Sequence, residues 1–225
     1  MMPVARRLAL LEWAGRSGSW IFEDDYDSEY RYVGRPVPAL QGFDQGQSVI
    51  FSGRFSKVLL PTLRLGYLVV PPDLVDTFAA ARFMTDRHSS VLDRAVMCDF
   101  LEGHFGRYIR RMRELHAARA EALVRAIESR VAGLIELAPT TAGISVVGWL
   151  KGDLRAEDVA RVAVMKGVEA VPLSRFVLGA ARPEGLVLGF APYDPNQIED
   201  AVARLSSAFD QCSNAALRSR QGRRV

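Results

Sequence analysis

Short apolar runs alternate with long helical patterns along the chain, and this alternation restricts the fold more than any other feature. The apolar runs lie at 20–22, 48–51 and 65–70. Apart from Ser48, they are apolar throughout rather than at alternate positions, which is typical of strands that are buried on both faces of a sheet. The helical patterns cover 5–17, about 90–102 and about 106–131. The pattern therefore predicts an α/β protein with a mostly parallel sheet.

The pattern changes after the densely charged helix that is expected at about 106–131. Further strands are expected at 144–150, 169–173 and 186–191, and further helices at 157–165 and 197–209. These elements predict a second, smaller α/β unit. We therefore expect one domain over 1–105 and a second over 106–225, which includes the interdomain helix. A basic tail at about 213–225, with four arginines, is expected to be a solvated terminus.

Composition excludes several classes of protein. The net charge of +3 is too small to demand a nucleic-acid partner. No apolar run approaches the ~18 residues of a membrane span, so no membrane association is expected. Cys98 and Cys212 are far apart and form no CxxC motif, which favours a reduced, cytoplasmic protein. The acids after Trp20 do not form a calcium loop, because Tyr30 and Pro36 replace the required Gly and Glu, and we predict no metal site.

Lysine is rare in this sequence, and one lysine lies at a position where its chemistry matters. Only Lys57, Lys151 and Lys166 are lysines among the 29 basic residues. Lys57 follows an apolar run, and Asp24 and Tyr26 follow another; ligands of open α/β sheets bind at such strand ends. A partly desolvated lysine forms an imine with an aldehyde, whereas arginine does not. Taken alone, Lys57 is equally typical of a surface lysine at a strand end.

An acid, a phenol, a lysine and an arginine together match the needs of pyridoxal phosphate (PLP). An acid keeps a pyridine nitrogen protonated, so that the ring accepts electrons. A phenol hydrogen-bonds the ring oxygen, and the guanidinium of Arg64 offers a fork of donors to a phosphate. The sequence supplies this set within 41 positions, from Asp24 to Arg64.

The motifs EDDYDSEYRY and SGRFSKVLLPTLRLGYLV resemble the aminotransferase domain of MocR/GabR-type (GntR family) transcriptional regulators. The likeness continues in DRHSSVLDRAVMCDFLEGHFGRYIRRMRELHAAR, TTAGISVVGWL, VEAVPLSRF and GLVLGFAPY, and it covers nearly the whole chain. The resemblance implies part of a fold type I (class I/II) PLP-transferase large domain, followed by a small C-terminal α/β domain. The winged-helix DNA-binding domain and the first half of the aminotransferase domain are expected to be absent, so no direct nucleic-acid binding is expected.

The resemblance also implies a role for individual residues. Lys57 becomes the catalytic residue that forms a Schiff base with PLP. Asp24 becomes the partner of the pyridine nitrogen and Tyr26 that of the ring oxygen. Ser56 and Arg64 become cofactor ligands, with Arg64 on the phosphate. Arg175, in PLSRF, falls where such regulators bind the carboxylate of a substrate or effector.

Three departures from the family pattern concern the site and its surroundings. Arg54 lies three positions before the lysine, where Ser or Thr usually binds phosphate. Ser145 replaces a usual His, and His116 a usual Tyr.

We expect a PLP-binding, aminotransferase-like protein that acts on an amino acid or amine, as a homodimer by resemblance. The alternatives are an effector-sensing domain of a MocR/GabR-type regulator without turnover, and an inactive truncated remnant.

Overall fold

The structure is a computed structural model, and it divides into two compact units. It describes residues 2–25, 28–34, 37–45, 47–56, 58–59, 61–179 and 183–221. The first unit covers residues 1–111 and the second covers 112–225. Each unit has its own sheet.

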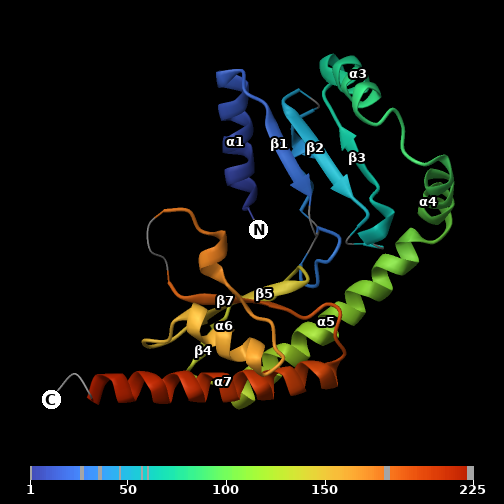
Figure 1. The fold of residues 1–225 in the computed structure, drawn as a ribbon. Coiled ribbons are helices and arrows are strands. Elements are labelled where there is room, and N and C mark those ends of the chain that lie inside the picture. Colours follow the sequence, from blue (N-terminus) through green and yellow to red (C-terminus); the bar gives the residue numbers. More distant parts are fainter. Residues whose placement is uncertain are drawn as a thin grey trace. The chain divides into compact units, whose positions relative to one another are not determined.

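The first unit is built on a three-stranded sheet in the order β1-β2-β3, drawn side by side in Figure 1. Its strands are β1 (Ile21–Asp25), β2 (Val49–Arg54) and β3 (Gly66–Val69). β1 and β2 pair in parallel, as expected, but β3 runs antiparallel to β2. The antiparallel pairing follows from the short connection, because a parallel pair needs a crossover of a dozen or more residues. The sheet is therefore mixed.

Helices and single turns complete the first unit. They are α1 (Val4–Ser17), α2 (Leu40–Phe43), η1 (Pro61–Leu63), η2 (Pro72–Leu74), α3 (Val75–Thr85), α4 (Val91–Gly103) and the first turns of α5 (Phe105–Arg130). α1 ends where Gly18 adopts the left-handed conformation, with φ of 61°, and its N–H bonds the carbonyl of Ala14. The helices expected at 5–17, 90–102 and 106–131 are thus present within a residue or two at each end.

The core of the first unit lies around β2. Val49, Ile50 and Phe51 are buried, as is Tyr30 from the loop after β1. Burial raises the pKa of Tyr30 to about 12. The expectation that all three strands are buried is wrong for β1 and β3. Phe22 is 62% exposed, and all four residues of β3 are exposed, because these strands form the two edges of the described sheet.

The second unit has a four-stranded antiparallel sheet in the order β4-β5-β7-β6. Its elements are the rest of α5, β4 (Ile135–Leu137), β5 (Ser145–Leu150), α6 (Ala156–Met165), β6 (Val171–Pro172), η3 (Leu173–Phe176), β7 (Gly185–Gly189) and α7 (Pro195–Gln221). α6 packs against α7, and both supply apolar residues to the core. Val159, Leu186, Phe190 and Phe209 are almost completely buried there.

Three elements of the second unit differ from the expectation. The strand expected over 169–173 is reduced to Val171–Pro172, since the chain turns into η3 directly after a proline that cannot donate to a ladder. β4 was not expected, because three residues are too few for a periodic signal. α7 continues to Gln221, well into the segment expected to be a frayed tail, because its Ala, Leu, Arg and Gln residues favour helix.

Among the described residues, no helix combines the length and the apolarity that crossing a membrane requires.

Candidate functional site

The three consecutive acids of β1 have three different environments. The carboxylate of Asp24 forms an ion pair with the Nη2 atom of Arg54, on β2. The carboxylate of Asp25 accepts from the N–H of Ser28 at 3.3 Å and from its Oγ at 2.6 Å. Glu23 lies on the opposite face of the strand from Asp24, since successive side chains of a strand alternate. Within the described residues, no group of three or more His, Cys, Asp or Glu could hold a metal ion.

Glu23 has a structural role at the start of α2. Its two carboxylate oxygens accept from the N–H groups of Leu40 at 2.7 Å and Gln41 at 3.0 Å. Arg7 lies 3.6 Å from the same carboxylate, with both side chains mostly buried, and donates to the carbonyl of Pro38 at 2.8 Å. These contacts fix the loop between β1 and β2. Glu23 is therefore engaged at the start of α2, and Asp24 is the acid that pairs with Arg54.

The predicted cofactor ligands Ser56 and Arg64 lie on two segments that are hydrogen-bonded to each other. The N–H of Phe55 donates to the carbonyl of Leu65 at 3.1 Å. Arg54, the last residue of β2, pairs in register with Gly66, the first residue of β3. The bond and the register hold Ser56 and Arg64 at the same end of the sheet as the Asp24–Arg54 pair.

Arg64 has an uncommon backbone conformation. Its φ is 47°, in the left-handed region that costs a non-glycine residue energy. The residue follows η1 and precedes β3, and it is exposed. Uncommon backbone conformations of this kind concentrate at functional sites. The backbone conformation thus distinguishes Arg64 independently of the resemblance that makes it a phosphate ligand.

Tyr67, on β3, is a residue at this end of the sheet that sequence reasoning did not select. Its ring lies over Gly53, where an added Cβ would lie 2.4 Å from the ring. The ring also contacts Phe51 and Phe55, with centroids 6.0 Å and 5.6 Å apart. Burial and the nearby charges of Glu29 and Asp25 raise the pKa of its hydroxyl. The glycine before the lysine motif was the available signal, since a strand glycine often marks a close approach.

Tyr26 and Lys57 lie outside the described residues. Their predicted roles at the ring oxygen and in the Schiff base therefore stay predictions. The structure places Asp24, Ser56 and Arg64 of the predicted set at one end of the sheet, and Arg54 pairs with Asp24 there. Tyr67 lies at the same end but on the opposite face of the sheet, because it pairs in register with Gly53, one position from Ser52 and Arg54.

Arg175 belongs to the second unit, where it lies in η3 and lines a hollow of ≈940 Å³. Arg161, Glu157, Glu169 and Tyr193 line the same hollow. Among the described residues that line it, the two arginines are thus matched by two carboxylates. Binding of a carboxylate by Arg175 stays a prediction.

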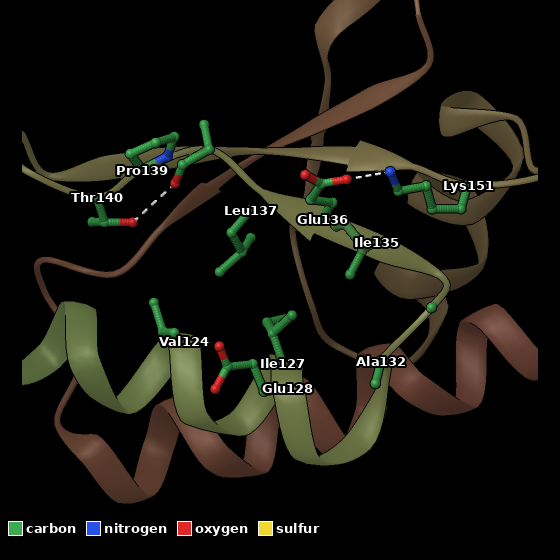
Figure 2. Close-up of a pocket in the computed structure, with 12 residues that line it drawn as sticks. Val124, Ile127, Glu128, Ala132, Ile135, Glu136, Leu137, Pro139, Thr140 and Lys151 are labelled. Carbon is green, nitrogen blue, oxygen red and sulfur yellow. Dashed lines mark hydrogen bonds and ion pairs between the residues drawn. The ribbon is translucent and has the colours of Figure 1, made fainter.

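A separate hollow of ≈540 Å³ opens between α5 and β4 in the second unit (Figure 2). Apolar side chains such as Val124 and Ile127 line it, together with Glu128. Lys151 forms an ion pair with Glu136 at its rim and lowers the pKa of that carboxyl. Because its lysine is already paired and the described lining residues include no arginine, this hollow does not suit a phosphorylated aldehyde. The candidate site is therefore at the end of the first unit's sheet.

Comparison with known proteins gives this site a context. No protein-family model matches the chain. The regulatory protein MocR of Rhizobium meliloti is 40% identical over 210 residues, which are 93% of this chain and 43% of MocR. The HTH-type transcriptional regulator YhdI of Bacillus subtilis is 32% identical over 210 residues, 93% of this chain and 45% of YhdI. The chain is a relative of MocR-type transcriptional regulators. It spans about half the length of the curated relatives that it matches.

The solved structures show the fold. LysN, an α-aminoadipate aminotransferase of Thermus thermophilus, was crystallised with N-(5′-phosphopyridoxyl)-L-leucine. It matches with a TM-score of 0.84 and 27% identity, over 95% of this chain and 56% of its own. The predicted resemblance to the aminotransferase-like part of MocR-type regulators is confirmed, as is the predicted fold class, part of a fold type I PLP-transferase.

Proposed function

We propose that this chain is a PLP-binding, aminotransferase-like domain that acts on an amino acid or amine through Lys57. The observation that carries the proposal is the gathering of Asp24, Ser56 and Arg64 at one end of the β1–β3 sheet. A carboxylate that accepts from the ring nitrogen, with a hydroxyl and a guanidinium that donate to the phosphate, is the set of partners that a phosphorylated pyridine requires. The crystallised ligand of LysN, at 27% identity, is a phosphopyridoxyl compound and supports the same cofactor.

Each residue has a distinct proposed task toward the cofactor. Asp24 holds the proton of the pyridine nitrogen, Tyr26 orients the ring oxygen, and Ser56 and Arg64 bind the phosphate. Lys57 binds the aldehyde through its amine. When bound, PLP supplies an electron sink for the bonds at the substrate Cα. Once the amine of the amino acid had displaced it from the aldehyde, the freed amine of Lys57 would take the proton from Cα and return it on the cofactor side.

The remaining parts of the proposal concern organisation. We propose residues 1–105 as the second half of the PLP-binding large domain. Residues 106–225 are proposed as the interdomain helix and small domain, with a basic tail at about 213–225. Arg175 is proposed to bind the carboxylate of the amino acid.

We also propose a homodimer, for which the exposed apolar side chains of α3 and α4 give support. Phe83, Met84 and Leu92 are 62%, 82% and 73% exposed, and patches of such residues mark interaction surfaces. Light scattering after gel filtration would test this: a mass of about twice 24.9 kDa is expected.

A second candidate function is effector sensing without turnover. The relatives at 40% and 32% identity are a regulatory protein and a transcriptional regulator, which favours this reading. Both candidates use the same residues to hold PLP and differ only in whether the amino group is transferred. Incubation of the PLP-loaded chain with a panel of amino acids separates them. Transfer of the amino group to the cofactor supports an enzyme, whereas a spectral change without transfer supports a sensor.

The binding claim is tested by trapping. The purified chain is incubated with PLP, reduced with borohydride and digested, and the mass of the peptide that contains Lys57 is measured. We expect one stable adduct at Lys57 and none in Lys57→Arg, because arginine does not form the imine. Lys151→Arg is the matched control and should leave trapping unchanged. A wild-type chain without an adduct at Lys57 contradicts the proposal.

A further inference from the structure

Arg54 connects the two ends of the candidate site. Its backbone pairs with Gly66, directly after the segment that carries Arg64. Its guanidinium instead reaches across to β1 and forms the ion pair with Asp24. The backbone of Arg54 therefore lies next to the segments that carry Ser56 and Arg64, whereas its guanidinium contacts Asp24, the predicted partner of the ring nitrogen.

The ion pair between Arg54 and Asp24 is accessible to solvent. The two side chains are 47% and 45% exposed. They share one face of the sheet, because Asp24 pairs in register with Ser52, two positions before Arg54. The attraction in an exposed ion pair of this kind shifts the equilibrium between paired and separated side chains by about fivefold at most. The guanidinium of Arg54 is thus held, but it is held weakly enough to exchange partners.

A phosphate, which carries close to two negative charges near pH 7, competes with the carboxylate for the same guanidinium. Arginine binds carboxylate and phosphate alike with two parallel, charge-assisted hydrogen bonds, so the additional charge of the phosphate favours the exchange. Ser56 and Arg64 lie on the segments joined by the Phe55–Leu65 hydrogen bond, next to the backbone of Arg54. A phosphate bound there would have a hydroxyl and one guanidinium already, and Arg54 would supply a second.

We propose that Arg54 is a partner-exchanging residue: Asp24 holds it until a phosphate arrives, and the phosphate then takes it. The exchange frees the carboxylate of Asp24 for the ring nitrogen, so that one side chain couples the two ends of the site. The identity of the ligand as PLP rests on the proposed function above. The competition of Asp24 and phosphate for Arg54 does not depend on it.

The competition is measured with inorganic phosphate alone, by titration of the full chain with calorimetry or ³¹P NMR. Asp24→Asn removes the competitor and should tighten phosphate binding by up to about fivefold. Arg54→Gln removes the receiving group and should weaken it by roughly 10- to 100-fold. Asp25→Asn is the matched control, since it removes the same charge from the same strand end while its side chain bonds Ser28. It should have less effect than Asp24→Asn.

Two results overturn the exchange. One is equal tightening by Asp24→Asn and Asp25→Asn, which shows a general charge effect. The other is unchanged phosphate affinity in Arg54→Gln. If circular dichroism shows that Arg54→Gln does not fold, Arg54→Lys replaces it. Lysine keeps the charge without the bidentate fork, so a loss smaller than that expected for glutamine supports the exchange, and no loss contradicts the bidentate contact.

A pyridoxal arm separates this inference from the proposed function. Wild-type chain should bind pyridoxal, which lacks the phosphate, more tightly when inorganic phosphate is present, and Arg54→Gln should abolish that cooperation. If an adduct forms at Lys57 but phosphate does not tighten pyridoxal binding, the result contradicts the exchange and still supports the proposed function. If the variants change phosphate affinity as predicted but no adduct forms at Lys57, the result contradicts the proposed function and still supports the exchange.

Discussion

Gly53→Ala tests whether the aromatic packing at the candidate site is as close as the structure shows. Gly53 is buried in the central strand β2. A Cβ added there would lie 2.4 Å from Cζ of Tyr67, 2.5 Å from Cε1 and 2.6 Å from the hydroxyl oxygen. Non-bonded carbons are most stable about 3.5–4.0 Å apart. The tyrosine ring must therefore move by about 1 Å.

The cost of this movement follows from the contacts that the ring loses. Tyr67 contacts the rings of Phe51 and Phe55, and aromatic pairs contribute about 0.5–1.5 kcal/mol each beyond their burial. Overpacking costs about 1–3 kcal/mol, and alanine in a strand recovers roughly 0.5–1 kcal/mol relative to glycine. Tyr67 is 46% exposed and can yield toward solvent. We expect a net loss of about 1–2 kcal/mol in the free energy of unfolding.

Urea unfolding followed by circular dichroism measures this loss, and a double-mutant cycle assigns it. In a Tyr67→Ala background the obstacle is gone, so Gly53→Ala should become neutral or stabilise by about 0.5 kcal/mol. Gly15→Ala is the control: a Cβ there meets nothing within 4 Å, and a helix gains roughly 0.5–1 kcal/mol. An equal cost of Gly53→Ala in both backgrounds would refute the reasoning.

Three further substitutions test other parts of the structure. Glu23→Gln should lower the free energy of unfolding by about 1.5–3 kcal/mol, since a charged acceptor of two amides becomes neutral; urea unfolding measures it, and no loss would contradict the contacts. Arg64→Gly should be more stable than Arg64→Ala by about 1 kcal/mol, because only glycine adopts φ of 47° freely, and equal melting temperatures would argue against that conformation. Burial lowers the pKa of His116 below its ordinary 6.5, so the unfolded state binds the proton first. Wild-type stability should fall as pH drops below 6.5; His116→Phe should flatten that slope, and an unchanged slope would exclude His116 as its cause.

The sequence predicted regular elements well where the pattern was long. The helices expected at 5–17, about 90–102, about 106–131 and 157–165 begin and end within about two residues of those bounds, because 3.6-residue periodicity is a local property of many side chains. Short elements are harder to predict from the sequence. β4 and α2 have three and four residues, and their formation depends on a neighbouring strand and on the Glu23 carboxylate.

The acids of β1 show the same division within the candidate site. The sequence indicated one cluster, Glu23 to Asp25, at a strand end. The structure divides it among the start of α2, Arg54 and Ser28. The partner of each carboxylate depends on the register between β1 and β2 and on the path of the following loop, and neither is a local property.

The sequence by itself determined the types and order of the main elements and the chemistry of the motif residues, since both follow from side-chain identity and local spacing. It also carried the likeness to MocR-type regulators. Only the tertiary structure decided that β1 and β3 are exposed edges, that Tyr67 lies over Gly53, and that Arg54 pairs with Asp24. The last two contacts join residues that lie 14 and 30 positions apart in the sequence, and these residues meet only because their strands pair.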